Sequence, residues 1–164
     1  MRHLLRLLSL ALLLPLALVQ AADSPPDSYR VGDPITPFTI KDQHDQALLV
    51  SAAEGIRHVI VSFDMPTGRD ANRYFEKRGA AFLPENDAIF LANIHGMPAI
   101  GRLFALPKMK KYPHRILLGD DEHLLDRYPA QDGKLTVLDL APDGRITAVR
   151  FLDPEKDLDQ LFAR

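Results

Sequence analysis

The stretch HVIVSFDMPTGRDANRYFEKR, at residues 58–78, contains the features that decide the fold class. Residues 58–63 form a continuous β-branched and aromatic run, which is typical of a strand buried on both faces. Residues 64–68 break this run, and Thr67 followed by Asp70 is a capping-box pattern that predicts a helix over residues 68–78. A second buried strand is predicted at residues 87–94 (DAIFLANI). Together these elements predict a β–α–β unit in an α/β protein.

The flanking sequence adds a hairpin on each side of this unit. Strands are expected at residues 38–41 and 47–50 around a polar turn, and again at residues 134–141 and 145–152. The second pair is joined by Pro142, Asp143 and Gly144, in which proline presets one dihedral and glycine accepts a positive one. A short strand is expected at residues 115–118.

Further helices are expected after the second buried strand. One follows Pro98, with Ile100, Leu103, Phe104 and Met109 on its inner face and a kink or break at Pro107. Shorter helices are predicted at residues 123–128 and 154–164. The expected fold is therefore a three-layer α/β domain with a central mixed sheet, an N-terminal hairpin, and a C-terminal hairpin followed by a helix.

Residues 1–21 have the pattern of a secretory signal peptide. Arg2 and Arg6 precede a 13-residue apolar stretch from Leu7 to Val19, and small residues follow it, which favours cleavage before Ala22. The apolar stretch is shorter than the roughly 20 residues that span a bilayer. We therefore expect an exported protein without a stable membrane anchor, periplasmic if the source is Gram-negative. Residues 22–30 are expected to be a flexible lead-in, and residues 31–164 the domain.

Composition excludes several functions. The 164 residues include no cysteine, which rules out thiol catalysis, disulfides and cysteine-ligated metal sites. Cleavage at residue 21 removes two arginines and no acid, which leaves 18 basic and 22 acidic side chains. Such a balance lacks the concentrated positive footprint that nucleic-acid binding requires.

The order of elements resembles the thioredoxin fold. VGDPITPFTIKDQHDQALLV at residues 31–50 resembles the opening of peroxiredoxins and of exported thiol–disulfide oxidoreductases for cytochrome maturation, and TVLDLAPDGRI at residues 136–146 resembles their hairpin. In an ungapped alignment, Gly68 and Ala71 stand where redox members carry the two cysteines, and Lys134 stands near their cis-proline. The resemblance thus implies a thioredoxin-like fold that has lost its thiol site. The chain would then be neither a thiol-dependent oxidoreductase nor a peroxidase.

The phrase HGMPAIGRLFALPK at residues 95–108 resembles small exported proteobacterial proteins often labelled FAD/FMN-containing dehydrogenases. That label implies a flavin, but the sequence has no Gly-rich dinucleotide loop between a strand and a helix. We therefore predict no cofactor. The alternative is an oxidoreductase that uses bound flavin or copper in place of thiols.

The loop after the first buried strand is the best candidate for a ligand site. Asp64, Met65, Thr67, Gly68 and Arg69 lie at the carboxyl end of a strand, where ligands of α/β sheets tend to bind. Free amides at the helix start could hold an anion with the help of Arg69. The structural alternative is that Thr67 and Asp70 only cap the helix.

Three other groups of residues have both a functional and a structural interpretation. His95 and Met97, with Met65, Met109 or His114, have the donor types of a soft copper site, although methionine usually fills cores. Residues 120–123 (DDEH) offer metal-ligand side chains, but acids in a first helical turn are also ordinary dipole partners.

The basic run Lys108, Lys110, Lys111, His114 and Arg115 could contact anionic headgroups or an acidic partner, or be a solvated helix end. The sequence thus favours an accessory module of the cell envelope that binds an envelope protein or a small ligand.

Overall fold

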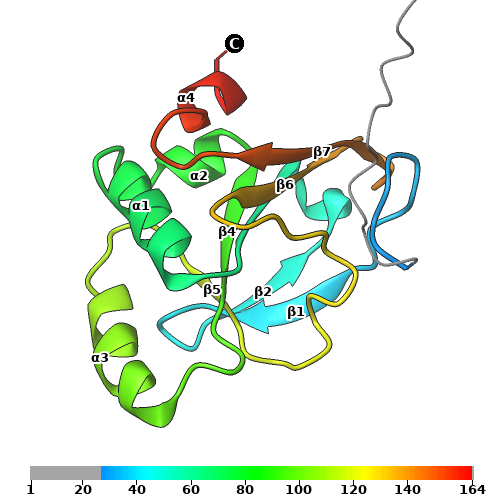
Figure 1. The fold of residues 1–164 in the computed structure, drawn as a ribbon. Coiled ribbons are helices and arrows are strands. Elements are labelled where there is room, and N and C mark those ends of the chain that lie inside the picture. Colours follow the sequence, from blue (N-terminus) through cyan, green and yellow to red (C-terminus); the bar gives the residue numbers. More distant parts are fainter. Residues whose placement is uncertain (1–26, 164) are drawn as a thin grey trace, which may run out of the picture.

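The computed structural model describes residues 27–163 and contains a five-stranded mixed sheet (Figure 1). The strand order is β5-β4-β3-β6-β7, with β3, β4 and β5 parallel to one another and β6 antiparallel to both of its neighbours. The strands are β3 His58–Ser62, β4 Ala88–Asn93, β5 Leu117–Gly119, β6 Leu135–Leu140 and β7 Ile146–Leu152. The β-branched and leucine-rich runs of the sequence thus become the central strands, as predicted.

A separate antiparallel hairpin and four helices complete the fold. The hairpin pairs β1, Phe38–Lys41, with β2, Ala47–Val50, at the predicted positions. A single 3₁₀ turn, Ala52–Glu54, follows it. The helices are α1 Met65–Glu76, α2 Phe82–Glu85, α3 Ala99–Met109 and α4 Leu158–Leu161.

The sheet separates two hydrophobic cores, which gives three layers. Val59 and Val61 of β3 point to the layer that contains the β1–β2 hairpin, whereas Ile60 points to the helix layer. Phe75 of α1 and Leu158 of α4 pack on that helix layer (Figure 1). This alternation follows from the period of two in a strand, and it explains why the central strands are apolar at most positions on both of their faces. The architecture is the expected thioredoxin-like one.

The C-terminal hairpin has the turn that its sequence predicts. Gly144 adopts a φ of +84°, and its amide donates a hydrogen bond to the carbonyl of Ala141 at 2.9 Å. A side chain is strained at such a dihedral, which explains the glycine after Pro142 and Asp143.

Several expectations about local structure are wrong. Residues 122–127 form turns rather than a helix, and the C-terminal helix is limited to α4. Pro107 does not break α3: the helix continues to Met109, although proline has no amide to donate to the preceding turn. Ser28 and Tyr29 are buried, so the packed chain begins before residue 31; the ring of Tyr29 lies edge-on to that of Tyr128 at 5.2 Å. Residues 1–21, and residues 22–26 of the expected lead-in, lie outside the described residues.

Candidate functional site

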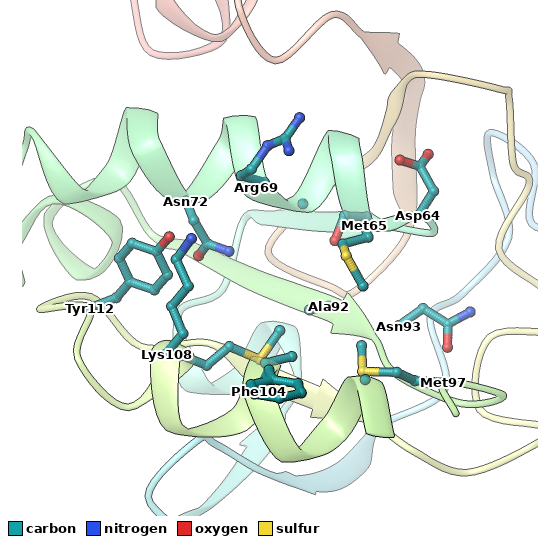
Figure 2. Close-up of a pocket in the computed structure, with 15 residues that line it drawn as sticks. Asp64, Met65, Arg69, Asn72, Ala92, Asn93, Met97, Phe104, Lys108 and Tyr112 are labelled. Atoms are coloured by element: carbon teal, nitrogen blue, oxygen red, sulfur yellow. The ribbon is translucent and has the colours of Figure 1, made fainter. Parts of the chain in front are cut away.

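A cavity of about 370 Å³ lies between α1, the end of β4, and α3 (Figure 2). We call it the α1–α3 cavity. Four of the five predicted loop residues line it, namely Asp64, Met65, Gly68 and Arg69, whereas Thr67 is buried beside it. The remaining lining residues are Ser62, Asn72, Ala92, Asn93, Met97, Gly101, Phe104, Ala105, Lys108, Met109 and Tyr112. The fold thus brings two distant sequence segments, residues 62–72 and 92–112, to one site.

The start of α1 differs from the predicted capping box. Asp64, not Thr67, is the N-cap: its carboxylate accepts hydrogen bonds from the amide of Thr67 at 2.8 Å and from the Thr67 hydroxyl at 2.7 Å. The helix therefore begins at Met65, three residues earlier than expected. Asp64 and Thr67 are both residue types that cap helices. Pro66 favours the earlier start, because proline is preferred in the first turn of a helix.

This start also changes the expected anion site. The amides of Thr67 and Gly68 already donate to Asp64, and Pro66 has no amide hydrogen. The helix tip therefore offers no cradle of free amides at residues 66–68. Arg69 lies on the rim, where its Nε is 3.7 Å from Asp70, and Figure 2 shows its guanidinium directed away from α3.

Gly68 allows α1 to lie close to the end of β3. A Cβ atom at this position would come within 3.0 Å of the Ser62 hydroxyl oxygen. Gly68 is also one turn into the helix, with its amide bonded to the Asp64 carbonyl at 3.0 Å. Gly68 therefore lies inside α1 and not at its start, where the predicted helix over residues 68–78 had placed it.

The polar end of the cavity is formed by Asn72, Lys108 and Tyr112, whose side-chain heads gather in Figure 2. Lys108 has no ion pair with any residue between 27 and 163. Burial, with a smaller effect of Glu76, raises the pKa of Tyr112, so that its hydroxyl remains a donor at neutral pH. One unpaired ammonium and one phenol therefore face the same space.

The rest of the lining is largely apolar. It includes Met65, Met97, Phe104 and Met109, and the thioethers of Met65 and Met97 extend towards each other from opposite walls in Figure 2. Flexible, polarisable methionines allow such a wall to fit ligands of different shapes.

The proposed imidazole and thioether donors are only partly assembled. Met97 lines the cavity, but His95 does not, and its Nδ1 lies 3.3 Å from the carbonyl oxygen of Asp120. His114 is fully buried elsewhere. In the described part of the chain, no group of three or more His, Asp or Glu residues is placed to hold a metal ion.

A buried polar network supports one wall of the cavity and was missed in the sequence. His114 Nε2 lies 2.9 Å from the side-chain oxygen of Asn72, and Gln43 bonds both the His114 carbonyl and the Ile116 amide at 2.8 Å. Burial lowers the pKa of His114 to about 4. The imidazole is therefore neutral. Its hydrogen bond with Asn72 fixes the orientation of that side chain at the polar end of the cavity. In the sequence, His114 lies close to Lys110 and Lys111, which suggested a surface residue. Its burial is evident only from the fold.

Two predicted surface clusters also separate in the fold. Arg115 turns away from the basic run and pairs with the buried Asp42 at 3.1 Å. In residues 120–123, Asp120 pairs with Arg102, whereas His123 pairs with Asp126 at 2.9 Å. We interpret these ion pairs as contacts that stabilise the fold and not as parts of a ligand site.

The orientation of α3 corrects the predicted inner face. Ile100, Leu103 and Phe104 are 66%, 67% and 71% exposed. The face that lies against the domain contains Leu106 and Met109, which pack on the core, and Arg102, whose guanidinium donates to the carbonyls of Met97 at 3.1 Å and Ile94 at 3.0 Å. Hydropathy alone could not predict that an arginine would point inwards.

Comparisons with known proteins agree with the fold. No family model matches the chain, and no curated protein matches it. Solved structures that are similar include the peroxidoxin BcpB of Mycobacterium tuberculosis, with 15% identity and a TM-score of 0.55 over 82% of this chain and 94% of that one. The thioredoxin domain of a thiol–disulfide oxidoreductase from Bacteroides vulgatus has 16% identity and a TM-score of 0.54 over 83% and 100%.

A peroxiredoxin-like protein from Aquifex aeolicus has 13% identity and a TM-score of 0.55 over 82% and 85%. At these identities the comparisons show the fold alone, which is thioredoxin-like. This chain carries that fold with no cysteine. Within residues 27–163, no helix is long and apolar enough to cross a membrane.

Proposed function

We propose that this chain is a thiol-free, thioredoxin-fold binding module of the cell envelope, and that its ligand occupies the α1–α3 cavity. Disulfide exchange and thiol-based peroxide reduction need a thiolate, which a chain without cysteine cannot supply. The observation that carries the proposal is the cavity itself, which lies at the carboxyl ends of β3 and β4, where ligands of α/β sheets bind.

The lining indicates the chemistry of the ligand. Three methionines and Phe104 supply apolar lining, and Lys108 with Tyr112 and Asn72 supplies polar lining. The only acid in the lining is Asp64, whose carboxylate is already engaged in capping α1. A ligand with an apolar body and one anionic group satisfies both kinds of lining, because the ammonium of Lys108 lacks a partner.

The proposed location follows from the first 21 residues. Their basic start, 13-residue apolar stretch and small residues before Ala22 have the pattern of a cleaved secretory leader. An exported protein without disulfides depends on its two hydrophobic cores for stability, and the described chain supplies both.

Decanoate is a suitable probe of the cavity, measured by isothermal titration calorimetry with residues 22–164. Ala105→Trp should abolish binding because Ala105 lines the cavity, whereas Ala99→Trp, on the exposed side of the same helix, should retain it. The chain has no tryptophan, so the fluorescence of each variant also reports its folding. Equal binding by both variants would show that decanoate does not occupy the cavity.

The charge of the ligand is tested with a matched pair of lysines. Lys108→Gln should weaken decanoate binding about tenfold, which corresponds to one charge-assisted hydrogen bond. Lys110→Gln, two residues away but outside the lining, should leave it unchanged. Stronger binding of decyltrimethylammonium than of decanoate would contradict an anionic ligand.

Copper bound by thioethers is the second candidate, because Met65, Met97 and Met109 line one cavity. It predicts stoichiometric copper in the purified protein, and tight Cu(I) binding that Met97→Leu weakens. A yellow visible spectrum would instead indicate flavin. If neither is found, the binding module remains the better account.

A further inference from the structure

The outer face of α3 exposes large apolar side chains to solvent. Ile100, Leu103 and Phe104 are spaced by three and four residues, which aligns them on one stripe of the helix. No residue of α3 is buried, although the helix contains five large apolar side chains. Isolated exposed apolar residues are ordinary, but a continuous stripe of them marks an interaction surface.

The charged side chains of α3 and of the two residues that follow it are all positive, and of these Arg102 pairs with Asp120. Residues 88–119 contain no aspartate or glutamate, although the whole chain has 22 of them. Lys108, Lys110 and Lys111 lie at the C-terminal end of α3 and are exposed. None has an ion pair with another residue in the described part of the chain. We call Ile100, Leu103, Phe104, Lys110 and Lys111 the α3 ridge.

We infer that the α3 ridge docks on the surface of an anionic lipid bilayer. Apolar side chains of an interfacial helix enter the boundary between headgroups and acyl chains, and lysines beside them contact the anionic headgroups. The ridge supplies both features on one helix. A local excess of positive charge on a chain whose total is −2 would also turn this helix towards a negative surface.

The position of α3 favours a flat surface over a protein groove or helix. Figure 1 shows α3 at a corner of the molecule, far from α4. Its stripe is therefore a projecting ridge that a plane can meet without clashes with the rest of the domain. Binding through three apolar side chains and a few lysines is reversible and requires no membrane-spanning segment.

Vesicle flotation with residues 22–164 tests the inference. We expect binding to vesicles of 30% phosphatidylglycerol in phosphatidylcholine, little binding to pure phosphatidylcholine, and release by 0.5 M NaCl because salt screens the headgroup charge. Lys110→Gln combined with Lys111→Gln should weaken binding about 30-fold, on the basis of the usual contribution of each lysine at an anionic surface. Ile100→Ser combined with Leu103→Ser should abolish it.

The controls use exposed residues elsewhere. Lys77→Gln with Lys156→Gln removes the same charge from the opposite end of the domain, and Val31→Ser with Leu49→Ser removes exposed apolar groups. Both control pairs should bind like the wild type. If the control pairs weaken vesicle binding as much as the ridge variants do, binding depends only on the overall charge or hydropathy of the protein, and the inference is overturned. An absence of binding to anionic vesicles would also overturn it and direct the search to an acidic protein partner. None of the four ridge residues mutated lines the α1–α3 cavity, so decanoate binding is unaffected by either result.

Discussion

Replacement of His114 by glutamine should remove a defined part of the pH dependence of stability. The imidazole is fully buried, and burial lowers its pKa from 6.5 to about 4. An unfolded chain therefore binds a proton at this residue between pH 6.5 and 4, whereas the folded chain does not. The free energy of unfolding then decreases as pH falls through this window, and the contribution of His114 is complete at pH 7.5. A shift of this size corresponds to about 3 kcal/mol.

Urea unfolding followed by circular dichroism at pH 7.5, 5.5 and 4 measures this contribution, since the chain has no tryptophan. Other groups also lose stability in acid, so the relevant quantity is the difference between the two proteins. The wild type should lose about 3 kcal/mol more than His114→Gln between pH 7.5 and 4. His44→Gln, which changes an exposed histidine, should follow the wild type. Parallel pH profiles for wild type and His114→Gln would refute a neutral, buried His114.

Three further predictions concern the helix start, the core and the leader. Asp64→Ala should lower the free energy of unfolding by about 1 kcal/mol through loss of the α1 cap, whereas Asp70→Ala should change it little; thermal melts that rank them in reverse would restore the capping box as predicted. Val61→Asp should unfold most of the protein because it buries an unpaired charge, whereas Lys110→Asp should not; equal midpoints in thermal melts would contradict the core described for β3. Intact mass of the exported protein should correspond to a chain that begins near Ala22, and a membrane-bound species that retains Met1 would show an uncleaved anchor.

The order of elements was predictable because it depends on local patterns that the fold preserves. The runs at β3, β4 and β6 are apolar at most positions and are buried almost throughout, as expected for strands covered on both faces. Both hairpins have turns with sequence-specific chemistry, as Gly144 illustrates. Their order then limited the topology to very few arrangements.

The orientation of α3 and the supports of the cavity were not predictable from the sequence. Hydropathy favoured burial of Ile100, Leu103 and Phe104, but the inner face of the helix contains Leu106, Met109 and Arg102, and the partners of Arg102 at residues 94 and 97 are backbone carbonyls. Every residue has a backbone carbonyl, so a sequence pattern does not indicate which carbonyl accepts a hydrogen bond from a side chain. His114 was misplaced for a related reason, because its partner Asn72 is 42 residues away.

The candidate site at the loop after β3 was predictable only in part. The sequence identified residues 64–69 as a site because a strand end and a helix start coincide there, and four of its five candidates do line the cavity. The opposite wall comes from α3 and Tyr112, and no local spacing connects it to the loop. Pocket shape depends on tertiary packing, which single-sequence patterns do not encode.

The central claim, that the α1–α3 cavity is the ligand site, is tested most directly by NMR of ¹³C-methyl methionine. The chain has four methionines, and the three that follow Met1, namely Met65, Met97 and Met109, all line this cavity. Titration with decanoate should shift all three methyl resonances together, with one saturable affinity that Lys108→Gln weakens and Lys110→Gln does not. Resonances that stay in place while calorimetry reports decanoate binding would mean that the ligand binds elsewhere and that the cavity is not the functional site.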